Sequence, residues 1–117
     1  MDNSLKEQLA SAGIDVDEAL ARFMNNEALL LKYLKRFATD GNRAALQAAL
    51  QAGDAPAAYA AAHTLKGVTG NLSMRRLYAA TCEVVEPLRA GDVAGAAANM
   101  AALDAAYRAV IDALARL

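Results

Sequence analysis

The sequence predicts an all-α domain: an antiparallel up-down four-helix bundle with an additional short N-terminal helix. Alanine, the residue with the highest helix propensity, is abundant, while proline occurs only twice. Apolar residues recur at steps of three and four, as they do on the buried face of an amphipathic helix. The connections between these periodic stretches are short, which favours antiparallel neighbours. The 117 residues suit a single domain, 1–117, with no internal repeat or linker.

Capping residues and glycines set the expected helix boundaries. A short N-terminal helical segment is expected over about 4–24, with Ser4 as the cap of its first part and Asp15 preceding its second part. Gly53 suits the position after a helix C-terminus, and Pro56 suits the first turn of the next helix. The four bundle helices are accordingly expected at about 27–52, 56–72, 74–90 and 93–116.

Two features are expected to disturb these helices. The sequence Asp40-Gly41-Asn42 predicts a break or a kink within the 27–52 helix. Pro87 lies late in the 74–90 helix and lacks the N–H that would bond the carbonyl of Glu83. The last turn of that helix should therefore kink or loosen.

The charge balance and the cysteine count narrow the functional classes. Twelve basic and 13 acidic residues give a net charge of −1, so we expect no broad basic surface for nucleic acid. The single cysteine, Cys82, excludes an intramolecular disulfide. The sequence has no apolar run of membrane-spanning length and no signal-peptide core. We therefore expect a cytoplasmic protein without membrane association, with the monomer as its expected state.

The chain contains one histidine, His63, within the helix expected at 56–72. On a helical wheel this histidine shares a face with Lys66, Gly67 and Gly70. His63 is therefore predicted to point away from the core. The opposite face of the wheel carries Ala58, Ala61, Leu65 and Leu72.

The two glycines on the histidine face are unexpected in a chain that uses alanine almost everywhere. Each glycine inside a helix costs about 1 kcal/mol relative to alanine. Without side chains at Gly67 and Gly70, the backbone of another protein can approach the imidazole of His63. Lys66, one turn from His63, is placed to attract a dianion attached to that imidazole. These residues predict a reactive histidine that a partner protein reaches.

The sequence also allows other interpretations of His63. A metal site needs several converging ligands, and the chain has no second histidine. A catalytic triad needs a serine elbow or a His–Asp pairing, and neither is visible. An ordinary exposed histidine remains an alternative. The glycines also have a structural alternative, in which Gly70 begins a helix end or both residues allow close helix packing.

The histidine segment resembles the signature of histidine-containing phosphotransfer (HPt) domains. Ser73 departs from the family pattern, since a glycine is common there, and Pro87 interrupts a helix that is usually continuous. Neither departure is expected to touch the His63 face. The resemblance spans nearly the whole chain and rests on a His-x-x-Lys-Gly core in an alanine-rich third helix, within the run His63-Thr-Leu-Lys66-Gly67-Val-Thr-Gly70-Asn-Leu72.

The resemblance implies a role in phosphorelay signal transduction. His63 would accept a phosphoryl group from the aspartyl phosphate of one receiver domain and pass it to an aspartate of another. Lys66 would stabilise the phosphorylated state, and Gly67 and Gly70 would give steric room. The implied docking surface is an apolar patch around the histidine. The candidates for that patch are Phe37, Thr64 and Val68.

The resemblance also implies the partners and the metal requirement. Response-regulator receiver domains and a hybrid histidine kinase are the expected partners. The chain itself is expected to hold no cofactor or metal, because the receiver supplies Mg²⁺. It is also expected to have no kinase activity of its own. Two alternatives stay open. One is a non-catalytic helical protein-interaction module, and the other is the phosphoacceptor domain excised from a hybrid or chemotaxis-type histidine kinase.

Overall fold

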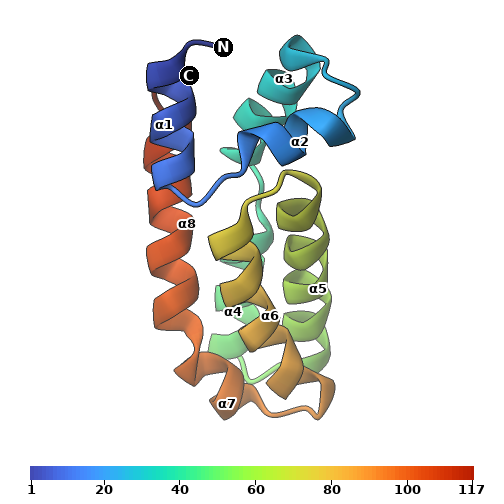
Figure 1. The fold of residues 1–117 in the computed structure, drawn as a ribbon. Helices are drawn as coiled ribbons and strands as arrows, with labels where there is room; N and C mark the ends of the chain where they lie inside the picture. The colour runs from blue at the N-terminus through green and yellow to red at the C-terminus, as the bar shows by residue number, and fades with distance from the viewer.

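The structure, a computed structural model, describes residues 1–117 and consists of helices, with one isolated β-bridge between Ile14 and Met74. Along the chain the helices are α1 Asn3–Ser11, α2 Val16–Arg22, α3 Glu27–Phe37, α4 Asn42–Gln51, α5 Ala55–Asn71, α6 Arg75–Arg89, α7 Val93–Ala98 and α8 Met100–Leu114. Helices α4, α5, α6 and α8 alternate in direction, so the predicted antiparallel up-down bundle is confirmed (Figure 1). None of the helices is both long enough and apolar enough to cross a membrane.

The bundle is elongated, with extents of 44 × 23 × 20 Å. Helix α5 lies between α4 and α6, and α6 packs in turn against α8. Helix α1 packs along α8, and α2 and α3 lie at the same end of the bundle as both chain termini (Figure 1). The first three helices therefore cover the end of the bundle where α5 finishes.

The core is one cluster of buried apolar side chains to which every helix contributes. On α5 the small buried alanines let α4 and α6 come close, and the fully buried Leu65 adds about 1.5–3 kcal/mol through burial. The buried side of the predicted helical wheel is thus confirmed. Its members, all at most 9% exposed, are Ala58, Ala61, Leu65 and Leu72.

The N-terminal segment expected at 4–24 forms two helices, α1 and α2, which correspond to its two expected parts. The cap of α1 is Asp2 and not Ser4, because the Asp2 carboxylate accepts a hydrogen bond of 2.8 Å from a backbone N–H of the first turn. Asp15 caps α2 in the same way at 3.0 Å, as expected. A new cap at Asp15 starts a new helix, so the two parts are separate.

The helix expected at 27–52 is fully interrupted, since α3 ends at Phe37 and α4 begins at Asn42. The Asp40 carboxylate accepts hydrogen bonds from the backbone N–H of Asn42 at 2.8 Å and from its side-chain amide at 2.9 Å. Such a local side-chain turn competes with helical backbone bonding. The predicted disturbance is therefore a break.

Pro87 stays inside α6, and its missing N–H is replaced by a side chain from the following segment. The Nδ2 of Asn99 donates a hydrogen bond of 2.8 Å to the Glu83 carbonyl, the group that the N–H of a non-proline residue at 87 would bond. Asn99 stands between α7 and α8, with φ −97° and ψ 0°. The helix expected at 93–116 is thus divided at the residue that compensates for Pro87.

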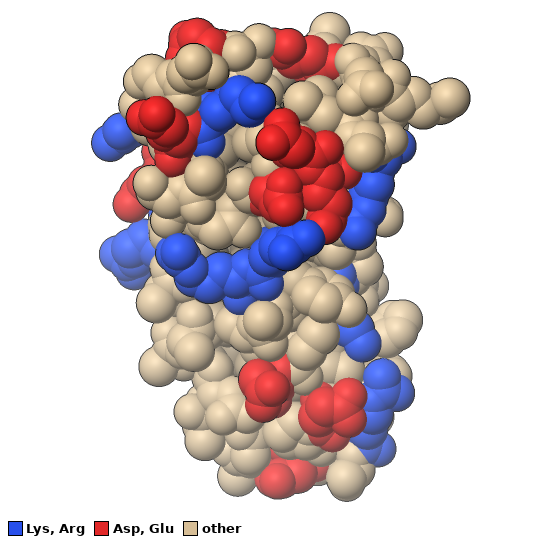
Figure 2. Space-filling model, in the orientation of Figure 1, with Lys and Arg blue, Asp and Glu red and all other residues tan.

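Polar contacts fasten α2 to the junction of α5 and α6. Arg75, at the start of α6, forms an ion pair with Glu18 of α2. Arg22 of α2 donates hydrogen bonds to the carbonyl of Gly70 and, at 3.2 Å, to the hydroxyl of Ser73. Acidic side chains accordingly lie next to a band of basic ones in the space-filling view (Figure 2). These contacts fix the position of α2 at the end of α5.

This network also changes the ionisation of its members. Hydrogen bonds from Arg75 and then from Ser73 lower the pKa of Glu18 below its ordinary value of 4.5. The same contact with Glu18 raises the pKa of Arg75. Ser73 itself is buried and has a φ of +53°, a backbone conformation that favours glycine. This conformation explains physically why a glycine suits position 73.

We expect Asn99→Ala to lower the free energy of unfolding by about 0.5–1 kcal/mol, because the Glu83 carbonyl loses its partner but stays accessible to water. Urea denaturation measures this change. The matched background is Pro87→Ala, which restores an N–H able to bond the Glu83 carbonyl. There the Asn99→Ala substitution should cost less, and an equal cost in both backgrounds would contradict the compensation.

The ion pair of Glu18 predicts an acid-sensitive contribution to stability. Because the pKa of Glu18 is lower in the folded state, its contribution is present above about pH 4.5 and is lost as the pH falls further. Thermal unfolding between about pH 6 and pH 3 should show a smaller drop in midpoint for Glu18→Gln than for the unsubstituted protein. Asp112→Asn, on an exposed part of α8, should keep the original response. Equal drops for Glu18→Gln and the unsubstituted protein would refute this prediction.

Candidate functional site

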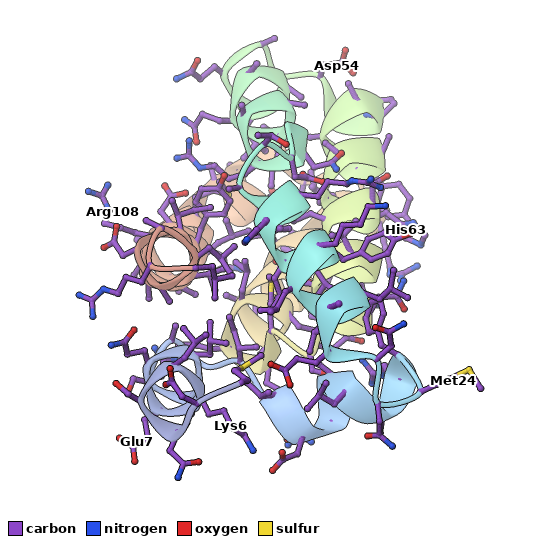
Figure 3. The ribbon with its side chains drawn as sticks, turned by 90° about the horizontal axis from the view of Figure 1, so that it is seen from above. Lys6, Glu7, Met24, Asp54, His63 and Arg108 are labelled. Carbon is purple, nitrogen blue, oxygen red and sulfur yellow. The ribbon has the colours of Figure 1, made fainter.

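His63 lies on the solvent-exposed side of α5, as the helical wheel predicts (Figure 3). Two further exposed residues, Gly67 and Asn71, follow it at steps of four, so the three form one strip along the helix. The opposite side of α5 is packed into the core. The imidazole is therefore accessible to a second molecule, while the core contacts of the opposite side position the helix that carries it.

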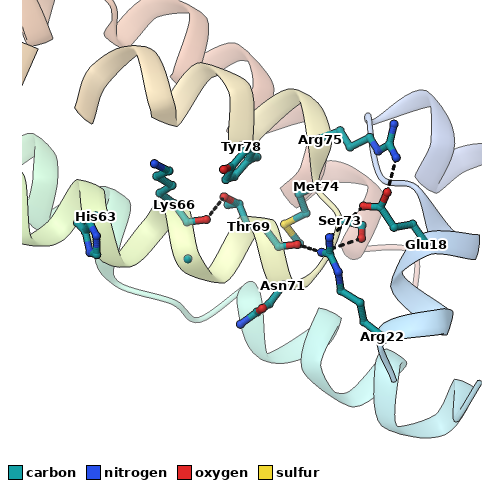
Figure 4. Close-up of a pocket in the computed structure, with 12 residues that line it drawn as sticks. Glu18, Arg22, His63, Lys66, Thr69, Asn71, Ser73, Met74, Arg75 and Tyr78 are labelled. Atoms are coloured by element: carbon teal, nitrogen blue, oxygen red, sulfur yellow. Dashed lines mark hydrogen bonds and ion pairs between the residues drawn. The ribbon is translucent and has the colours of Figure 1, made fainter. Parts of the chain in front are cut away.

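An open groove of about 680 Å³ begins at His63 and runs to the junction of α5 and α6 (Figure 4). It brings Lys66, Gly67 and Gly70 together with His63, as the sequence predicts. We call it the polar groove, because most of the residues that line it are polar or glycine. They are Glu18, Arg22, His63, Lys66, Gly67, Thr69, Gly70, Asn71, Ser73, Met74, Arg75 and Tyr78.

The polar groove carries an excess of positive charge. Three cationic side chains, Lys66, Arg22 and Arg75, line it together with one carboxylate, that of Glu18. Both arginines pair with Glu18, whereas Lys66 forms no ion pair within the chain. The ammonium group of Lys66 is thus the cation available to an anion bound near His63. The expectation that Ser73 lies away from the histidine face is wrong, since Ser73 lines this groove.

An aromatic ring lies beside the imidazole. The rings of Tyr59 and His63 are 5.7 Å apart between centroids and inclined by 33°. Arg89, from the end of α6, donates a hydrogen bond of 3.3 Å to the Tyr59 hydroxyl and places its guanidinium 5.8 Å from the centre of that ring. The position of Arg89 could not be predicted from the sequence, because no local spacing connects the C-terminal end of α6 to the middle of α5.

The two glycines of the histidine face have different surroundings. A Cβ atom added at Gly67 would meet nothing within 4 Å, so open space lies there. A Cβ atom at Gly70 would lie 3.3 Å from Cε2 and 3.4 Å from Cδ2 of Tyr78. The space at Gly70 is therefore already filled by a ring from α6. This arrangement corresponds to the alternative of close helix packing and differs from the expected clearance for a partner.

The apolar patch predicted around the histidine is placed differently from expectation. Phe37 is 2% exposed and packs against Tyr107, with 6.0 Å between ring centroids, so it presents almost no surface to a partner. Thr64 is exposed, and its hydroxyl donates a hydrogen bond to the carbonyl of Ala60. Val68 is half-buried and lines a second groove, which Phe37 also lines.

This second groove, of about 600 Å³, lies between α3 and α5, and we call it the apolar groove. Leu29 and Tyr33 of α3 line it and are 36% and 39% exposed. Nothing in the sequence marks these two residues as exposed, because both belong to the apolar stripe of their helix. Arg22 and Asn71 line both grooves, so the polar and apolar grooves meet at the end of the strip that begins with His63.

The chain was compared with known proteins. Neither the curated protein sequences nor the solved structures contain a match to it. The family model described as "Hpt domain" matches residues 38–115. This range contains α4 to α8 and therefore His63, Lys66 and Gly67, whereas α1 to α3 lie outside it.

Hpt domains act in phosphotransfer in two-component and phosphorelay signalling, where they interact with receiver domains and kinases. The match covers two thirds of the 117 residues and includes the helix with the exposed histidine. The protein therefore belongs to the histidine-containing phosphotransfer (HPt) domain family, and its function is phosphotransfer in signalling of this kind.

Proposed function

We propose that His63 is the phosphoryl carrier of a phosphorelay, taking the group from the aspartyl phosphate of one receiver domain and passing it to an aspartate of another. The observation that carries this proposal is the exposed imidazole in the polar groove, with the unpaired Lys66 beside it and open space at Gly67. His63 is also the one histidine in the chain. It lies within the matched Hpt range.

The chemical step is an exchange of one bond to phosphorus for another. A ring nitrogen of His63 attacks the phosphorus of the aspartyl phosphate, a P–N bond forms, and the bond from phosphorus to the carboxylate oxygen breaks. The aspartate leaves as a carboxylate. Delivery is the reverse, with a carboxylate of the second receiver as the attacking group. Attacking and leaving atoms lie roughly in line with the phosphorus, which demands access along one direction.

Residues around His63 provide access, charge and orientation for this step. The open space at Gly67 lets the receiver bring its aspartate close to the imidazole. Lys66, which has no carboxylate partner within the chain, attracts the phosphoryl group once it is attached to His63. Tyr59 restricts the imidazole from one side. These contributions bind and orient, as expected where positioning and electrostatics provide most of the catalysis.

The Mg²⁺ ion that phosphoryl transfer uses is proposed to come from the receiver. The polar groove contains a single carboxylate, that of Glu18, and Arg75 and Arg22 already engage it. Hard divalent cations prefer several oxygen ligands. In this proposal the chain supplies the accepting nitrogen and cationic side chains, and the receiver supplies the metal.

Incubation with a phosphorylated receiver domain from the source organism should label the protein with an acid-labile, base-stable phosphate. His63→Gln should remain unlabelled, because it removes the accepting nitrogen. Radiolabel transfer followed by acid and base treatment measures this. Failure of every receiver of the organism to label the protein would overturn the carrier proposal, as would equal labelling of His63→Gln.

Gly67→Gln should slow phosphoryl transfer from the receiver by about tenfold or more, because its side chain occupies the approach to His63. The free energy of unfolding should stay the same or rise, because glutamine is the better helix former and the site is open. Stopped-time transfer assays and urea denaturation measure the two quantities.

Ala105→Gln, at an exposed position on α8, is the matched control for Gly67→Gln and should transfer at the original rate. A second comparison uses phosphoramidate, a phosphodonor much smaller than a receiver. Its reaction with His63 should be slowed much less by Gly67→Gln than transfer from the receiver. Unchanged receiver kinetics in Gly67→Gln would contradict the role of open space.

A further inference from the structure

Tyr78 lies on the far side of α5 from the apolar groove, on the first part of α6 (Figure 4). It is 38% exposed and belongs to the few large apolar side chains that the protein leaves at its surface. Met74 is the other hydrophobic residue that lines the polar groove, and it is fully buried. Of the two hydrophobic residues that line the polar groove, Tyr78 is thus the one whose side chain is exposed.

The ring of Tyr78 is held in place by the backbone of α5. It packs onto Gly70 so closely that a Cβ there would stand 3.3 Å from its Cε2 atom. A ring with two rotatable bonds that already packs against the chain on one side loses less conformational entropy than a long flexible side chain when a partner covers it. The hydroxyl of Tyr59 accepts a hydrogen bond from Arg89, whereas that of Tyr78 makes no hydrogen bond within the chain.

The position of Tyr78 makes it adjacent to any partner that reaches His63. Such a partner covers the exposed strip of His63, Gly67 and Asn71, which runs between the polar and apolar grooves. Tyr33, in the apolar groove, is exposed to nearly the same degree as Tyr78. The strip is therefore flanked by one tyrosine from α3 and another from α6.

We propose that Tyr78 is a binding residue for the receiver domain, which packs an apolar side chain against the face of its ring. The partner's contact surface then spans α5 and includes α6. The occupant is a receiver because the groove is continuous with His63, and because its excess of cationic side chains suits a partner that carries an aspartyl phosphate. The inference rests on the proposed function of His63. Tyr78 acts on affinity and does not touch the reacting atoms.

The test is transfer from the phosphorylated receiver, measured at increasing receiver concentration. Tyr78→Ala should raise KM by about tenfold with little change in kcat, as expected for the loss of an aromatic interface contact. Labelling of His63 by phosphoramidate should be unchanged, since this donor does not use the docking surface. Tyr78→Phe keeps the ring and should remain within about twofold of the original KM.

Two further variants test whether the effect belongs to the ring itself. Gly70→Ala keeps Tyr78 but brings a Cβ against it, so the ring must shift by a few tenths of an ångström. The rise in KM should be smaller than in Tyr78→Ala. Arg108→Ala removes a large exposed side chain on the opposite side from His63 and should leave KM unchanged (Figure 3). Thermal unfolding verifies that each variant is folded.

The outcomes separate this inference from the proposal on which it rests. If the unsubstituted protein accepts phosphate but Tyr78→Ala keeps the original KM, the inference is wrong and the carrier role stands. If Tyr78→Phe raises KM as much as Tyr78→Ala, the receiver contacts the hydroxyl of Tyr78, and the proposed packing on its ring is refuted. If no receiver phosphorylates the unsubstituted protein, the carrier role itself fails.

Discussion

The packing of α5 between α4 and α6 is the constraint on which the rest of the structure depends. Its buried alanines allow close approach of both neighbours, and Leu65 is fully buried on the core side of the helix. Rotation of α5 by one residue, about 100°, would expose Leu65 and press the imidazole of His63 toward apolar side chains. Leaving a buried polar group without a hydrogen-bond partner costs about 1–3 kcal/mol. The outward direction of His63 is therefore set by core contacts on the other side of the helix.

Local patterns in the sequence were sufficient to predict the fold class and the helix face that carries His63. The wheel placed His63 outward and Leu65 inward because both directions follow from residue spacing along one helix. The cap at Asp15 could likewise be predicted, since its carboxylate accepts a hydrogen bond from a backbone N–H within its own turn. Interactions between residues that are a few positions apart leave a local sequence pattern, and the helices of this structure agree with those patterns.

Contacts between helices could not be predicted from the sequence. The ring of Tyr78 occupies the space at Gly70, and Asn99 bonds the carbonyl that Pro87 leaves free. Each contact joins two helices or their ends, so neither shows in the periodicity of one segment. The burial of Phe37 could not be predicted for a similar reason, because an apolar stripe shows which side of a helix is apolar but not how much of that side its neighbours cover.

The apolar groove has one side on α3, which precedes the residues matched by the Hpt family model. The exposed histidine, the unpaired lysine and the open glycine position all come from α5, inside that range. Substitutions at Leu29 or Tyr33 can therefore reshape the surface beside the site without disturbing the helix that holds His63. On the proposed function, changes in the leading helices would alter partner preference while the residues around His63 stay the same.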